Sequence, residues 1–220
     1  MIGCETIGDS REGEMKGGGV IVEERFVFEK EKHLTVMKTN IFFASDGFTV
    51  FDRDVQVVFR VDSYGPNTRD AGELVLMDPV GRCILTVRRK RPSLHQRWEG
   101  FVGDRREGDL KPIFSVKRSS MIGRSNVTVE LFGDRTEEYL IEGSFVHRNC
   151  TIYNSEKETM AVISRKVDIS TNMMLGKDVF SLTLKPGFDG AFAMGLVLVL
   201  DQTNGNGDGD DNDRAVAKRR

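Results

Sequence analysis

The segment FDGAFAMGLVLVLD, residues 188–201, is the one long stretch of this 220-residue chain that is apolar on every side. Its ten residues 191–200 carry no charge. A helix of that length rises about 15 Å, roughly half of a bilayer core, so it is too short to span a membrane. It is also too apolar for a protein surface. We therefore predict a helix buried inside a shell of strands, with an axial core made by Phe192, Met194, Leu196 and Leu198.

Strand-like alternation of apolar and polar residues precedes this segment. It is cleanest at 127–131 and 180–185, where the period of two indicates half-buried strands. Further strands are expected at 34–38, 48–51, 56–61, 74–77, 83–88, 112–118, 138–146, 151–154 and 160–166. About a dozen short strands separated by turn residues are typical of a barrel or a sandwich. The predicted fold class is therefore mainly β.

An internal repeat marks three of the expected hairpins. In each copy an apolar residue is followed by Asp or Asn, a short turn, and an apolar strand that ends in basic residues. The copies span 51–60, 77–88 and 153–165. An Asp or Asn side chain can accept hydrogen bonds from the backbone that follows it, and Gly81 permits a positive φ in the second copy. We expect a meander of similar hairpins.

Composition divides the chain into three zones. Residues 1–19 end in three glycines and predict a flexible arm, 20–202 form one domain, and 203–220 predict a disordered tail rich in Gly, Asn and Asp. The three cysteines include no C-x-x-C pair, and the first residues lack the apolar stretch of a signal peptide. We expect a cytoplasmic protein, with the membrane surface and the nucleus as alternative locations.

Basic residues are concentrated in one part of a chain whose net charge is −2. Residues 82–128 hold twelve Lys or Arg against four Asp or Glu. If the basic strand ends meet at one end of a barrel, they form an anion site for phosphoinositide head groups or an anionic membrane surface. The predicted site residues are Arg88, Arg89, Lys90, Arg91, Lys117, Arg118, Arg165 and Lys166. The alternative is that these residues only keep the strands solvated and deter edge pairing.

Motifs for other kinds of site are missing from the sequence. His33, His95 and His147 lack the spacing of metal ligands, and the acidic tract 208–213 lacks the glycine and glutamate of a calcium loop. The sequence has no nucleophile elbow or phosphate-binding loop. Few aromatic residues interrupt the basic stretch, which disfavours nucleic-acid binding. We expect no enzymatic activity, no cofactor and no metal.

Several motifs, taken together, resemble the plant LURP-one-related family. They are SDGFTVFD at 45–52, VVFRVDSY at 57–64, LVLMDPVGRCILTVRRKRPSL at 74–94, FSVKRSSMIG at 114–123, LGKDVF at 175–180 and PGFDGAFAMGLVLVLDQ at 186–202. They occur in order across residues 20–202. The resemblance implies a closed twelve-stranded barrel threaded by a hydrophobic C-terminal helix, similar to tubby C-terminal domains and phospholipid scramblases.

The family is associated with plant defence, and the resemblance implies no defined biochemical activity. We expect a monomeric regulatory or interaction module without a transmembrane segment, recruited to anionic membranes through its basic residues. The alternatives are a protein-binding scaffold with an unidentified partner, a scramblase-related lipid function, or a membrane-tethered transcription regulator as in tubby relatives. Gly195 departs from the simplest family helix and costs about 1 kcal/mol relative to Ala, unless close packing against the barrel wall requires it.

Overall fold

The computed structural model describes residues 19–40, 46–63, 72–91, 97–104, 111–121, 124–133, 137–168, 170–171 and 173–205. The strands are β1 (Lys32–Asn40), β2 (Asp46–Phe51), β3 (Val57–Ser63), β4 (Glu73–Met77), β5 (Cys83–Arg89), β6 (Trp98–Val102), β7 (Phe114–Met121), β8 (Arg124–Leu131), β9 (Glu138–Ser144), β10 (Asn149–Tyr153), β11 (Thr159–Arg165) and β12 (Val179–Leu184). A 3-10 turn at Glu24–Phe26 precedes them, and helix α1 (Gly190–Gly205) follows. The helix thus runs three residues beyond the domain boundary expected at 202. Residues 1–18 of the expected arm and 206–220 of the expected tail lie outside the described residues.

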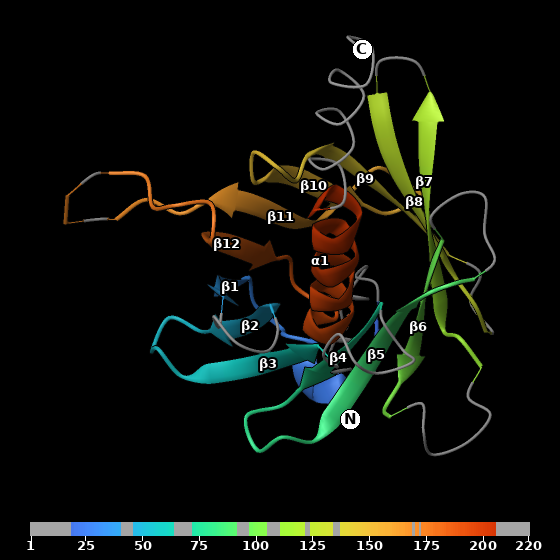
Figure 1. The fold of residues 1–220 in the computed structure, drawn as a ribbon, viewed down its shortest axis with the longest axis horizontal. Coiled ribbons are helices and arrows are strands. Elements are labelled where there is room, and N and C mark those ends of the chain that lie inside the picture. Colours follow the sequence, from blue (N-terminus) through green and yellow to red (C-terminus); the bar gives the residue numbers. More distant parts are fainter. Residues whose placement is uncertain are drawn as a thin grey trace, which may run out of the picture.

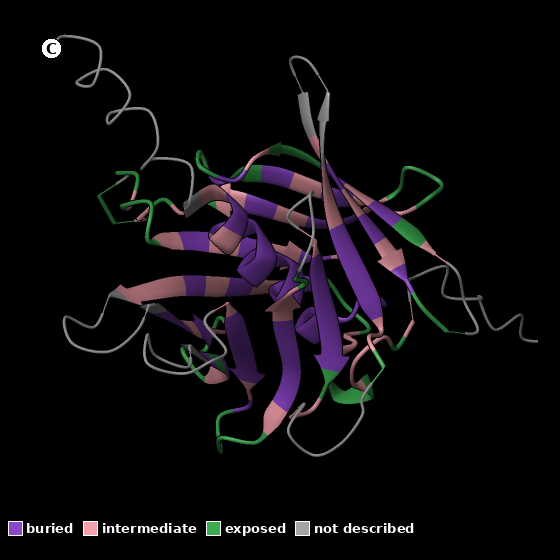
Figure 2. Cartoon of the chain, turned by 45° about the vertical axis from the view of Figure 1, so that its right-hand side comes forward, coloured by how far each residue is buried: buried purple, intermediate pink, exposed green. Residues whose placement is uncertain are grey.

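The strands form a closed antiparallel barrel around α1, as the resemblance implies. They pair in chain order, and β1 pairs with β12 to close the sheet (Figure 1). Figure 2 shows that α1 is buried within the strands except in its last turn, which is partly exposed. Phe192, Met194, Leu196 and Leu198 are 0% exposed, and each such burial contributes about 1.5 to 3 kcal/mol. Among the described residues, no helix is long and apolar enough to cross a membrane.

Two glycines allow the helix and the wall to pack closely. A Cβ atom on Gly195 would lie 2.5 Å from Leu85 Cδ2 on β5, so the helix approaches the wall where its side chain is missing. A Cβ atom on Gly100 of β6 would lie 2.1 Å from the Phe114 ring. That ring packs edge-on against Phe192, with 5.2 Å between the ring centroids. The close packing that would justify a glycine inside the helix is therefore present.

The three repeated hairpins are confirmed. The residue that begins each turn accepts hydrogen bonds from the backbone N–H groups two and four positions on, over 2.8 to 3.1 Å. These residues are Asp52, Asp78 and Asn154. The fourth residue of each turn has a positive φ, 60° at Val55, 89° at Gly81 and 62° at Lys157. The same bulged loop occurs three times, although one copy alone has the glycine that this φ favours.

Strand β6 is absent from the strands predicted above. Its first four residues, Trp98–Phe101, are all buried, and Gly100 interrupts the pattern. The outer face of the sheet is also buried here, because Val75, Thr86 and Phe101 lie side by side on β4, β5 and β6 and are at most 3% exposed. Strands that are buried on both faces show no alternation. The sequence signal for β6 was therefore weak.

Helix α1 gives the barrel two distinct ends. Phe192 at its start packs against Phe114 at the start of β7, and Thr203 near its end accepts a hydrogen bond from Arg118 of the same strand. The helix therefore runs in the direction of β7 and of every other odd-numbered strand. The end where α1 begins is termed the lower end, and the end where it finishes is termed the upper end, as in Figure 1.

The lower end is closed by a buried carboxylate. Asp189 Oδ1 accepts hydrogen bonds from the N–H groups of Ala191 and Phe192, at 2.9 and 3.1 Å, and so caps the helix. Asp189 Oδ2 accepts three more, at 2.7 to 3.1 Å, from the N–H groups of residues 21–23. One side chain thus joins the start of the described chain to the start of its last element.

Candidate anion-binding site

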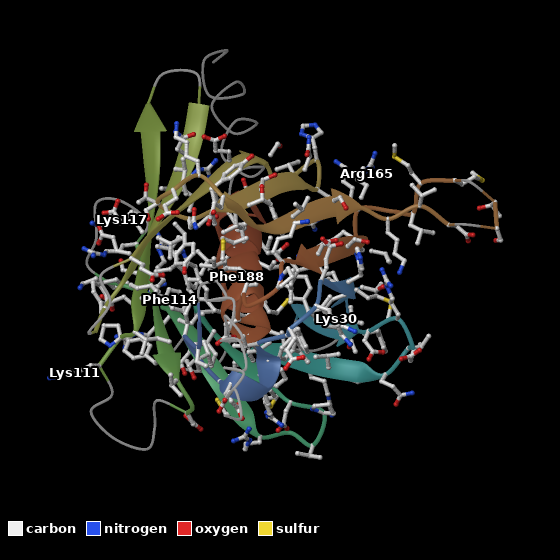
Figure 3. All side chains as sticks on the ribbon, turned by 180° about the vertical axis from the view of Figure 1, so that it is seen from behind. Lys30, Lys111, Phe114, Lys117, Arg165 and Phe188 are labelled. Carbon is white, nitrogen blue, oxygen red and sulfur yellow. The ribbon has the colours of Figure 1, made fainter. Side chains whose placement is uncertain are left out.

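The three basic segments lie at the same end of the barrel. Residues 88–91 lie at the end of β5 and 165–166 lie at the end of β11. Residues 117–118 lie in the middle of β7, level with the end of α1, where Arg118 contacts Thr203. All three strands are odd-numbered and run toward the upper end. The residues do not meet at one point, because Lys117 and Arg165 lie on opposite sides of α1 in Figure 3. The predicted site residues therefore form two separate groups on the rim of the barrel's upper end.

The first group, termed the β5–β7 cluster, is partly neutralised by carboxylates. Its members are Arg88, Arg89, Lys90, Arg91, Arg97 and Lys117. Lys90 Nζ lies 2.8 Å from Glu99 Oε1, and Glu130 forms ion pairs with both Arg97 and Lys117. The side chains of Lys90 and Lys117 are still 47% and 40% exposed. Basic side chains outnumber these carboxylates, so the cluster presents accessible positive charge.

Within this cluster, Arg88 belongs to the packing of the wall. Its guanidinium lies 5.6 Å from the centroid of the Phe101 ring, and its Nε is buried without a hydrogen-bond partner. Glu73 stands opposite it on β4. In contrast, Lys90 and Arg91 are exposed. Within the predicted stretch 88–91, the accessible cations are therefore Lys90 and Arg91.

Arg118 has a different position from its neighbour Lys117. It lines a pocket of about 190 Å³ at the upper end, beside the last turn of α1. Its Nη1 donates a hydrogen bond of 3.1 Å to the Thr203 carbonyl, where the helix dipole favours a cation. Pockets for drug-sized ligands have about 300 to 1,000 Å³. This pocket therefore has room for a small group and not for a whole lipid head group.

Two basic residues outside the predicted set hold the end of the helix. Arg148 is buried between the rings of Phe145 and Phe180, with its Cζ 4.1 and 4.3 Å from their centroids. Its Nη2 lies 3.7 Å from Asp201 Oδ1, and Lys38 Nζ lies 2.9 Å from Asp201 Oδ2. Burial lowers the pKa of Arg148, and the nearby Asp201 opposes that shift. Asp201 could have been found from the sequence, because it is a charged residue at the end of the apolar segment. No local sequence pattern distinguishes Arg148.

Two cysteines lie among the described residues. Cys150 is buried beside Arg148, and Cys83 is partly exposed. Burial raises the pKa of the Cys150 thiol to about 11, with Arg148 acting in the opposite direction. The thiol is therefore protonated at neutral pH and is a poor nucleophile. No cluster of three or more metal-ligating side chains occurs among the described residues.

The second basic group lies at the base of a projecting connection. The β11–β12 arm, whose described residues are 166–168, 170–171 and 173–178, extends away from the barrel in Figure 1. Lys166 Nζ donates a hydrogen bond to the Thr35 hydroxyl of β1. Arg165 Nη1 lies 3.2 Å from Met174 Sδ. Both cations therefore contact neighbouring side chains and keep the base of the arm positively charged.

Residues 32–201 match the LURP-one-related family. The chain belongs to this family. It is 56% identical over 212 residues to Protein LURP-one-related 12 of Arabidopsis thaliana. This alignment covers 96% of the present chain and 95% of the relative. It is 65% identical over 188 residues to Protein LURP-one-related 5 of the same plant, covering 84% and 89% of the two chains. The fold is also similar to an X-ray structure of an Arabidopsis thaliana protein, with a TM-score of 0.60 and 25% sequence identity. The similarity covers 85% of the present chain and 99% of that protein.

The LURP-one-related match begins at the first residue of β1 and ends within α1. It includes every strand of the barrel and both basic groups. It excludes residues 21–23, which bind the buried carboxylate of Asp189. The family and the fold class predicted from the sequence are both confirmed.

Proposed function

We propose that this LURP-one-related protein is a non-enzymatic regulatory or interaction module that binds anionic membrane surfaces, including phosphoinositide head groups, through the upper end of its barrel. The observation that supports the proposal is that all three basic segments lie at that end. A surface of concentrated positive charge is attracted to an anionic leaflet, at about 1 kcal/mol for each basic residue near the membrane.

The charge of the lower end supports a single orientation. Two of its hairpin turns hold more carboxylates than cations, with Asp52 and Asp54 beside Arg53 in one turn and Glu156 and Glu158 beside Lys157 in the other. Opposite charges at the two ends create a field that turns a protein as it approaches a charged surface. The upper end therefore meets an anionic membrane first.

The filled interior supports a surface site. Helix α1 occupies the barrel axis, with Phe192 and Leu196 fully buried, so the interior has no room for a lipid. The accessible cations Lys90, Arg91 and Lys117 lie outside on the rim. The resemblance also implies a role in plant defence. Binding to an anionic membrane would place the protein at the membrane for that role.

Flotation of the full chain with vesicles tests this proposal. The vesicles contain phosphatidylcholine alone, phosphatidylcholine with phosphatidylserine, or phosphatidylcholine with phosphatidylinositol bisphosphate. The test variant combines Arg89→Ser, Arg91→Ser and Lys117→Ser, and leaves Lys90 in place because Glu99 is only 7% exposed and needs its partner. At about 1 kcal/mol per residue, we expect its partition coefficient to fall roughly a hundredfold.

The matched control removes the same charge from the lower end. It combines Lys30→Ser, Arg53→Ser and Lys111→Ser, at three exposed positions, two of which are labelled in Figure 3. We expect this control to bind like the wild type, and both variants to keep the wild-type melting temperature. Absence of wild-type binding to anionic vesicles, or equal binding by the two triple variants, would overturn the proposal and leave a protein-binding scaffold as the better explanation.

A further inference from the structure

The β11–β12 arm exposes apolar side chains at the basic end of the barrel. Val167, Met173 and Met174 are 41%, 66% and 62% exposed. They lie close together, because Val167 and Met174 form an antiparallel bridge and Met173 precedes Met174 in the chain. Exposed apolar side chains that gather in one place mark contact sites. The arm is therefore a contact surface separate from the β5–β7 cluster.

Backbone hydrogen bonds give the arm a defined shape. The Asp168 N–H donates to the Met173 carbonyl, and the Leu175 N–H donates to the Lys166 carbonyl, both over 2.9 Å. These bonds continue the pairing of the two strands beyond the wall of the barrel. The methionine side chains are therefore held outside the core and are accessible to a binding partner.

The charges beside the apolar side chains identify the kind of partner. Arg165, Lys166 and Lys177 flank the arm, and its acidic residues are Asp168 and Asp178. The Arg165 guanidinium lies directly against the Met174 sulfur. Apolar side chains next to a basic excess are typical of segments that lie in the interface of an anionic bilayer.

Exposed apolar residues at the lower end do not gather in one place. Val55 and Val80 are 73% and 89% exposed. Val55 follows Asp54 in the turn between β2 and β3, whereas Val80 lies in the turn between β4 and β5, where Arg82 pairs with the buried Asp78 carboxylate. Exposure alone therefore does not distinguish the arm, whereas the combination of three neighbouring apolar side chains with adjacent cations does.

We infer that the β11–β12 arm inserts Val167, Met173 and Met174 into the interfacial layer of an anionic lipid bilayer, while Arg165 and Lys177 contact the head groups. The inference rests on the proposed function, because it takes the membrane as the partner of the upper end. Insertion of the arm adds a hydrophobic contribution to the free energy of membrane binding. Salt does not screen this contribution, whereas it screens the electrostatic attraction of the β5–β7 cluster.

A tryptophan reporter tests insertion directly. Trp98 is 3% exposed, so its emission is that of a buried indole and is insensitive to vesicles. The Met173→Trp variant adds an exposed indole on the arm, and the Val80→Trp variant adds one at the lower end. With phosphatidylserine vesicles, we expect a blue shift and quenching by brominated acyl chains for Met173→Trp, and neither change for Val80→Trp.

Loss of binding provides the second measurement. We expect the Met173→Ser, Met174→Ser double variant to reduce vesicle binding in 0.5 M salt at least about tenfold, since two apolar side chains lose their burial. The Val80→Ser control should bind like the wild type. If the wild type binds no anionic vesicles, the proposed function itself fails. If the wild type binds, but the Met173→Trp side chain is not quenched and the double variant binds equally, the arm does not insert and only this inference is overturned.

Discussion

Asp189 and Asp201 stand at the two ends of α1 and are both buried, yet their carboxylates are satisfied in different ways. Asp189 accepts hydrogen bonds from five backbone N–H groups, three of them from residues 21–23. Asp201 instead lies against the cationic side chains of Lys38 and Arg148. The lower end is therefore closed by backbone geometry, whereas the upper end is closed by charge.

The largest effect is expected from removing the lower carboxylate. The Asp189→Ala variant leaves five N–H groups without their acceptor, and each buried unpaired donor costs about 1 to 3 kcal/mol. Even if water satisfies several of them, we expect the free energy of unfolding to fall by about 4 kcal/mol or more. Urea denaturation followed by circular dichroism measures this loss. A loss below about 1 kcal/mol would show that the backbone contacts do not close the lower end.

A smaller loss is expected at the upper end. The Asp201→Asn variant keeps an oxygen acceptor but removes the charge that faces Arg148, whose side chain is 8% exposed. We expect a loss of about 2 to 3 kcal/mol, because a buried cation is left without its partner. A double-mutant cycle with Arg148→Met should give a coupling energy of about 1 to 3 kcal/mol. Additive effects of the two changes would contradict closure by charge.

Asp78 at the lower end forms ion pairs with Arg25 and Arg82, and these contacts predict sensitivity to acid. Burial of Asp78 tends to raise its pKa, but hydrogen bonds from Arg25 and Arg82 outweigh this and lower the pKa from 3.8 to about 2. A lowered pKa stabilises the fold above pH 3.8, and this contribution is lost as the pH falls toward 2. Urea denaturation between pH 5 and pH 2.5 should show a shallower decline for Asp78→Asn than for the wild type. Parallel curves would argue against these contacts.

The smallest effect concerns the turns that build the lower end. Val55 and Lys157 adopt the positive φ that Gly81 adopts in the equivalent turn. Left-handed backbone costs about 1 to 2 kcal/mol for a residue with a side chain, and glycine loses part of this gain to its larger unfolded-state entropy. We expect Val55→Gly to raise stability by up to about 1 kcal/mol and Gly81→Val to lower it. Calorimetric melting temperatures measure both changes, and a lower value for Val55→Gly would show that its φ is not strained.

Features that depend on local sequence could be predicted. The uncharged run 191–200 identified the helix and its burial, and Asp52, Asp78 and Asn154 identified three hairpins of one type. The shared end of the basic segments did not follow from the predicted strands, because without β6 the strands at 83–88 and 112–118 are consecutive and point in opposite directions. The sequence therefore predicted most of the fold, whereas the common end of the cations depended on a strand that it did not reveal.

Features that depend on distant residues could not be predicted. The hydrogen bonds of Asp189 reach back 166 to 168 residues along the chain, and no short motif announces them. The ion pairs of Glu130 with Arg97 and Lys117 arise because β6, β7 and β8 are adjacent. The register of that part of the sheet was unknown without β6. For this reason the sequence predicted the basic residues but neither their partial neutralisation nor their division into two groups.

The pairing of β1 with β12 has a consequence for biosynthesis. Nascent domains generally fold from the N-terminus as they leave the ribosome, but here the first strand waits for the last strand, and the core helix is made after both. Until then the growing sheet has two unpaired edges and an empty centre, which is a state prone to association with other chains. Such long-range topologies also fold slowly. The barrel can therefore close around its core only after α1 has been synthesised.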